Sequence, residues 1–216
     1  MEQLFVLAVL FILITSSCAL AQPVTVQSLL EEQVDFERLA TQPEAGRDSD
    51  QWSSYDRASV APEADGWFAN ADAGQFIRTE ERNGETEFVM AEMTGPGAIV
   101  RLWSANPDGA GIIRIYIDDM TSPALEADFL ALTTAEVPEF PAPFSGRRAM
   151  GANLYFPFPY AHQCKVTATK PGFYYHVGYT TFPQGTEVEP FNLETFATLG
   201  PTLLKVGRLL ENPTSG

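Results

Sequence analysis

Between residues 87 and 180 the sequence repeats with a period of two, and turn signals interrupt the pattern at short intervals. The clearest example is residues 111–118, where Ile113, Ile115 and Ile117 share one face. Many short strands separated by Gly, Pro and Asn turns are typical of an all-β jelly-roll sandwich. The other predicted strands are residues 87–93, 98–104, 152–158, 163–169 and 173–180.

Both flanks of this region return to helical spacing. Residues 25–41 are predicted to form a helix, because apolar residues recur at helical spacing and Ser28 and Glu31 have the spacing of a capping box. Towards the C-terminus, Asn192 is a candidate N-cap, and Gly200-Pro201 should break the helix before a second apolar stripe. Flanking N- and C-terminal helices are therefore expected beside the sandwich.

The first 21 residues have the organisation of a secretory signal peptide. An unbroken apolar run, residues 4–14, precedes an A-x-A cleavage pattern that ends at Ala21. The run is too short to span a bilayer as a helix. We expect a secreted or periplasmic protein with no membrane contact after cleavage. The alternative is a lipoprotein anchored at Cys18.

Composition narrows the class of partner. Cleavage leaves roughly 195 residues, enough for one domain with a sizeable core. The formal net charge is −15, so the chain repels phosphate backbones and nucleic acid is not an expected partner. Cys164 would be the lone thiol, and His162 and His176 stand far apart in the sequence. No metal site and no cofactor are expected.

A series of short motifs, taken in order, resembles one family. The motifs are residues 53–57, residues 66–70 with Asp72 and Gly74, and residues 95–107, 114–118 and 151–160. Together they resemble DUF2961, now classed as glycoside hydrolase family 172. The resemblance implies a double jelly-roll, assembled as trimers or higher oligomers. It also implies exo-acting, retaining enzymes that process α-fructofuranosides or D-arabinofuranosides.

Members of that family are longer than this chain, with a second jelly roll after the point where it ends. The sequence therefore resembles the first half of a double jelly-roll. The expected organisation is a signal peptide (1–21), an N-terminal helix with long loops (22–86), the jelly-roll sandwich (87–190) and a connecting helix (191–216).

A retaining glycosidase needs two carboxylates about 5–5.5 Å apart, one of them with a raised pKa. The resemblance places that pair in the second jelly roll, so the catalytic residues are unknown here and the chain alone should be inactive. Glu126 and Asp128 follow a predicted strand and are candidates in principle. We expect them to be solvated or capping carboxylates instead.

Four residues are the candidates for substrate contact. Tyr55 offers a ring face, Asp56 accepts sugar hydroxyls and Arg57 supplies a fork of donors. Trp103 shares a strand face with Arg101 and could form a stacking platform. The alternatives are a salt bridge that pins the loop and a stacked pair inside the sandwich.

Three classes of function remain open on the sequence. The first is half of an exported furanoside hydrolase, whose partners are a furanose-containing oligo- or polysaccharide and either identical copies or a second jelly-roll half. The second is a non-catalytic carbohydrate-binding or assembly module, and the third is a purely structural jelly roll. Trp67 is expected to cover the core, and the stripe 203–210 to be exposed and to favour association.

Overall fold

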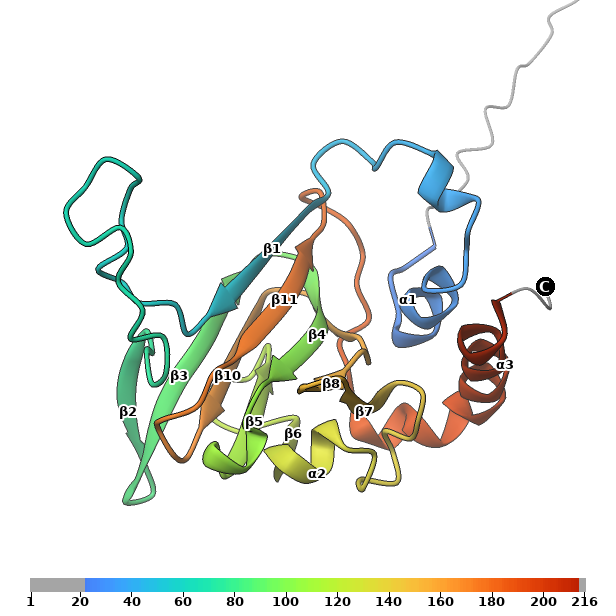
Figure 1. Cartoon of the computed structure of the whole chain (residues 1–216). Helices are drawn as coiled ribbons and strands as arrows, with labels where there is room; N and C mark the ends of the chain where they lie inside the picture. Colours follow the sequence, from blue (N-terminus) through green and yellow to red (C-terminus); the bar gives the residue numbers. More distant parts are fainter. Residues whose placement is uncertain (1–21, 214–216) are drawn as a thin grey trace, which may run out of the picture.

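The computed structural model describes residues 22–213 (Figure 1). The predicted signal peptide and Cys18 lie outside these residues. Two antiparallel sheets pack face to face, with short helices at the N- and C-terminal flanks, which confirms the predicted all-β sandwich. Among the described residues, no helix is long and apolar enough to cross a membrane.

We call the two layers the first and the second sheet. The first sheet has the strand order β1-β11-β4-β8-β7, and β9 also pairs with β4. The second sheet has the order β2-β3-β10-β5-β6. The strands of the first are β1 (Asp48–Ser53), β4 (Gly97–Ser104), β7 (Ser145–Arg148), β8 (Gly151–Leu154), β9 (Phe158–Tyr160) and β11 (His176–Thr181). Those of the second are β2 (Arg78–Arg82), β3 (Glu85–Thr94), β5 (Ile112–Ile117), β6 (Leu125–Asp128) and β10 (Gln163–Ala168).

The core lies between the two sheets, as the alternating pattern requires. Ile113, Ile115 and Ile117 all belong to the main buried cluster, together with Leu102 of β4. Phe156 and other rings continue the cluster beneath the C-terminal segment. Because these side chains point inward, their strand neighbours point to the outer faces of the sandwich.

The sandwich reaches further towards the N-terminus than the pattern indicated. The stretch before residue 87 was expected to form loops, yet it contributes β1 and β2. Both are edge strands with mostly polar side chains, so hydrophobic alternation did not mark them. Residues 152–158 in turn divide into β8 and β9 around Pro157, which has no backbone donor for a ladder.

The N-terminal helix is shorter than predicted. Its capping box uses Thr25 as the N-cap and Ser28 as the reciprocal partner, so the predicted box was displaced by one turn. Helix α1 (Val26–Glu32) then ends well before residue 41, and only the short 3-10 turn η1 (Arg38–Ala40) follows.

At the C-terminal flank Asn192 caps as predicted, accepting a hydrogen bond from the Glu194 amide. The segment it caps is the 3-10 helix η3 (Leu193–Leu199). The break expected at Gly200-Pro201 is present, because η3 ends at Leu199 and helix α3 (Gly200–Glu211) begins at Gly200, where a proline needs no donor.

The stripe of α3 is largely covered within this chain. Val206 is buried, and Gly207 lies against Pro143 and Phe144. Helix α3 also contacts α1. Leu204 and Leu210 remain exposed, so the apolar surface is part of the predicted stripe and not the whole of it.

Helix α2 (Phe129–Thr133) and the 3-10 turn η2 (Pro107–Gly109) complete the fold. Asp128 is the N-cap of α2 and accepts from the Ala131 amide at 3.0 Å. Glu126 pairs with Arg114 at 2.7 Å. Asp128 is therefore a capping carboxylate, as expected, whereas the half-exposed Glu126 has a different structural role, an ion pair with Arg114.

Candidate functional site

The loop that joins β1 to β2, residues 54–77, extends away from the sandwich and is called the arm below (Figure 1). Asp56 lies at its base and accepts hydrogen bonds from the Ala58 and Ala71 amides, both at 3.0 Å. These bonds lower the pKa of Asp56, so its carboxylate is charged and committed to the backbone. The alternative expectation was a salt bridge that pins the loop. In the structure, backbone amides bind the Asp56 carboxylate in its place.

Arg57 is held by the same part of the arm. Its guanidinium donates to the carbonyls of Tyr55 and Ser53 at 2.6 and 3.0 Å, and it lies 4.0 Å from the centre of the Tyr55 ring. The Arg57 guanidinium therefore covers one face of the Tyr55 ring, and Tyr55 as a whole is half exposed. Substrate contact by Tyr55, Asp56 and Arg57 stays a prediction.

Trp103 lies on the outer face of the first sheet, because its neighbour Leu102 points into the core. Its ring lies beside that of His176, with 4.6 Å between centroids. On the other side it spreads over Gly151, where an added Cβ would come within 2.2 Å of the indole Nε1. Glycine at this position is what allows the indole to lie flat on the sheet.

Arg101 continues this surface, as the period of two predicted. Its guanidinium donates to the Asn153 side-chain oxygen at 2.9 Å and stands over the Tyr155 ring at 5.5 Å. We call Arg101, Trp103, Asn153, Tyr155 and His176 the shelf. Burial, followed by the charge of Arg101, lowers the pKa of His176.

The shelf and the base of the arm meet at one end of the first sheet. Ser53 pairs with His176, and His176 pairs with Trp103, so the arm leaves the sheet two strands from the indole. Adjacent strands are about 4.8 Å apart, which puts these backbones roughly 10 Å from each other. The four predicted contact residues thus share one end of the sheet without forming a single cluster.

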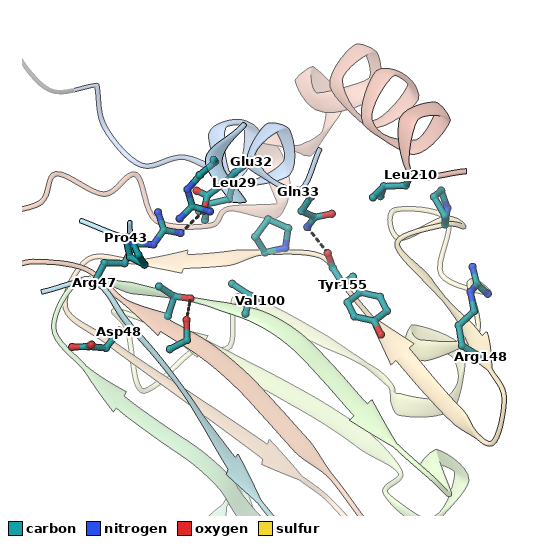
Figure 2. Close-up of a pocket in the computed structure, with 15 residues that line it drawn as sticks. Leu29, Glu32, Gln33, Pro43, Arg47, Asp48, Val100, Arg148, Tyr155 and Leu210 are labelled. Carbon is teal, nitrogen blue, oxygen red and sulfur yellow. Dashed lines mark hydrogen bonds and ion pairs between the residues drawn. The ribbon is translucent and has the colours of Figure 1, made fainter. Parts of the chain in front are cut away.

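Tyr155 belongs to the shelf and also lines a cavity of about 810 Å³ (Figure 2). The outer face of the first sheet forms its floor, with Val100, Ser49 and Thr180. Gln33, the C-cap of α1, and Leu210 of α3 contribute to its walls. Its volume falls in the range of small-molecule sites.

The polar side chains that line the cavity differ in whether they have hydrogen-bond or ion-pair partners. Glu32 binds both Arg38 and Arg47, the latter at 2.5 Å, and the side-chain Nε2 of Gln33 donates to the Tyr155 carbonyl at 2.7 Å. Arg148, in contrast, pairs with no carboxylate among the residues that the structure describes. Its guanidinium donates to the Arg147 carbonyl at 2.9 Å and remains exposed.

The carboxyl groups with a shifted pKa are not suited to general acid chemistry. The pKa values of Asp56, Glu80, Glu92 and Asp119 are all lowered, whereas a glycosidase acid needs a raised one. For Glu80, burial raises the pKa but hydrogen bonds from Lys165 and Arg78 outweigh it. In the described part of the chain, no group of three or more His, Cys, Asp or Glu side chains could hold a metal ion.

Sequence reasoning missed Tyr155, Arg148 and Gln33, which line the cavity. One signal was available, because residues 140–186 contain no Asp or Glu although the chain has 28 such residues. That stretch contains Tyr155 and Arg148 but not Gln33, whose place in the cavity the acid-free stretch could not have indicated. Trp67, expected to cover the core, is instead exposed on the arm.

The fold defines a two-sheet antiparallel domain with a cavity on the outer face of one sheet. A family model described as the GH172 first beta-sandwich domain matches residues 45–199. The chain therefore belongs to glycoside hydrolase family 172, of which it contains the first β-sandwich domain. No curated protein matches the chain.

Proposed function

We propose that this chain is the substrate-binding first half of an exported, exo-acting glycoside hydrolase of furanosides. The observation that carries the proposal is the cavity of about 810 Å³ beside the shelf, in a domain of a glycoside hydrolase family. The substrate class is an α-fructofuranoside or D-arabinofuranoside end of an oligo- or polysaccharide. The predicted signal peptide supports action outside the cytoplasm, in the periplasm or in secreted form.

The chemistry of this surface suits a sugar. Trp103 and Tyr155 offer ring faces for the apolar side of a furanose. Arg148 supplies unpaired donors for hydroxyl oxygens, while Ser49 and Thr180 add hydroxyls on the cavity floor. An exo-acting enzyme holds one terminal sugar, and a cavity bounded by two helices would limit how much chain can enter.

Hydrolysis itself is assigned to a second sandwich domain. A retaining mechanism needs one carboxylate for attack and a second, protonated one to donate to the leaving oxygen. The lowered pKa values of Asp56, Glu80 and Glu92 argue against that second role for these groups. The first domain then positions the sugar, and the second breaks the bond.

Reconstitution tests this division of labour. Residues 22–216 would be incubated with 4-nitrophenyl α-fructofuranoside or arabinofuranoside, alone and together with a purified second sandwich domain of the family. We expect release of 4-nitrophenol only in the mixture, and about tenfold slower release with Trp103→Ala. Release by residues 22–216 alone would contradict the assignment of the carboxylates, and no release in the mixture would contradict the proposal itself.

The second candidate is a carbohydrate-binding or assembly module without catalysis. The same downward pKa shifts favour it, because no shifted carboxyl in the described residues is tuned as an acid. It predicts that a furanoside binds residues 22–216 and that no partner domain produces turnover.

A further inference from the structure

A β-bulge in β4 joins the cavity and the shelf into one surface. The pairing of β4 with β11 shifts at Val100, which is the extra residue of the bulge. Ile99 and Leu102 are both fully buried, and the two residues between them, Val100 and Arg101, are both partly exposed. Strict alternation would send one of these two into the core. Because of the bulge, the outer face runs from Val100 in the cavity floor to Arg101 and Trp103 on the shelf.

The two ends of this surface are too far apart for one sugar. Val100 and Trp103 are three residues apart, which is roughly 10 Å along a strand. The neighbouring strand β11 is laid out in the same way, with Thr180 in the cavity floor and His176 opposite Trp103. This length exceeds that of a furanose ring. A single sugar in the cavity therefore leaves the Trp103 indole free to contact a second one.

Trp103 is held in place as a stacking surface. Its ring lies 4.6 Å from the His176 ring, centroid to centroid, and the pyrrole side of the indole lies over Gly151. Contacts on two sides fix the orientation of the side chain, so stacking costs little additional entropy. Trp103 is nevertheless partly exposed, and an indole face binds the apolar side of a sugar ring.

Arg101 and Tyr155 mark the boundary between the cavity and the shelf. The Arg101 guanidinium stands over the Tyr155 ring, and Tyr155 lines the cavity (Figure 2). Arg101 uses Nε and Nη2 to donate to the Asn153 side-chain oxygen, at 3.3 and 2.9 Å. Its Nη1 has no hydrogen-bond partner within residues 22–213. A donor at this boundary can bind the oxygen that links two sugars or a hydroxyl beside it.

We propose that the shelf is a second subsite, which binds the unit attached to the terminal furanose. The inference rests on the proposed function, because it places the terminal sugar in the cavity. Trp103 lies outside the cavity lining, so the glycan leaves the cavity over Arg101 and continues across the indole. The bond to be broken then lies above Arg101, and Trp103 binds the leaving-group side. The ligand class is a furanoside whose attached group is itself a ring, either a second sugar or an aromatic group.

Ligand length tests this subsite by calorimetric titration of residues 22–216. The methyl furanosides of D-arabinose and fructose are compared with the methyl glycosides of the corresponding furanosyl disaccharides. For the sugar that binds, the disaccharide should bind about tenfold more tightly than the monosaccharide. Trp103→Ala should abolish this gain. Tyr155→Ala should weaken both ligands and keep the gain, and Tyr174→Ala, another exposed aromatic, is the control and should match the parent.

Equal affinities of the parent for monosaccharide and disaccharide, or a gain that survives in Trp103→Ala, would overturn the second subsite while leaving the cavity as a sugar site. Failure of every ligand to bind would contradict the proposed function itself and this inference with it. If Trp103→Ala fails to fold, nuclear magnetic resonance of the parent decides. The disaccharide should shift the Trp103 Nε1–H signal and the monosaccharide should not, and equal shifts with both would overturn the inference.

Discussion

The outer faces of the two sheets both carry polar side chains, but these are organised in opposite ways. On the second sheet the charges satisfy one another. Arg114 donates to Glu85, Glu87 and Glu126 at 2.7 to 2.8 Å. On the first sheet α1, α3 and the segment 38–49 enclose a cavity in which Arg148 has no carboxylate partner among the described residues.

Burial sharpens this contrast. Glu87 is 1% exposed and also accepts from Tyr116 and Thr167, while Lys165 and Arg82 cover the Tyr116 ring. Burial, followed by Glu87, raises the pKa of Tyr116 to about 12, so the phenol stays a donor. A face whose buried charges are already paired offers little to a ligand. The unpaired donors and open rings of the first sheet are therefore where binding is expected.

The largest expected effect is on stability, from opening the network of the second sheet. Glu87→Gln removes the buried charge that neutralises Arg114 and should lower the free energy of unfolding by about 3 kcal/mol. Chemical denaturation measures it. Glu85→Gln removes a half-exposed partner of the same guanidinium and should cost less than about 1 kcal/mol. Equal losses for the two variants would show that burial does not distinguish them.

The next effect disturbs the shelf. Gly151→Ala places a Cβ within 2.2 Å of the Trp103 indole and should cost about 2 kcal/mol while displacing the ring. Tryptophan fluorescence and thermal unfolding report the two changes. At Gly178 an added Cβ meets Arg101 only at 3.6 Å, so Gly178→Ala on the same face is the control and should be close to neutral. Loss of stability in both variants would remove the special role of Gly151.

A smaller effect concerns affinity. Trp103→Ala should weaken furanoside binding to residues 22–216 about tenfold while changing the free energy of unfolding little, because the ring lies on the outer face. Isothermal titration calorimetry gives the affinity. Tyr174→Ala alters another exposed aromatic, and its affinity should match that of the parent. Equal weakening in both would point to general destabilisation instead of a lost stacking contact.

The smallest effect is a dependence on pH. The pKa of His176 is lowered from 6.5, so the folded state binds fewer protons than the unfolded state in that region. Its stabilising contribution is present above 6.5 and declines as pH falls through the folded pKa. His176→Gln should flatten this decline, and His162→Gln, at an exposed position, should not. A steeper decline in His176→Gln would contradict the sign.

The sequence predicted the core strands well and the edges poorly, for a physical reason. Residues 111–118 alternate because one face meets the core, and β5 forms there as predicted. Edge strand β1 has no buried face to encode, so polarity alone indicated a loop. The same limit applies to function. A strand face can be predicted for Trp103, but the cavity at Tyr155 depends on where α1 and α3 pack.

Nuclear magnetic resonance of the indole groups tests the central claim most directly, because the chain has only three tryptophans. Residues 22–216, labelled with ¹⁵N, would be titrated with a fructofuranose- or arabinofuranose-terminated oligosaccharide. We expect a saturable shift of the Trp103 Nε1–H signal, while that of Trp52, whose Nε1 is buried, stays fixed. An unchanged Trp103 signal at saturating sugar, or equal shifts at Trp103 and Trp52, would contradict binding on the outer face of the first sheet.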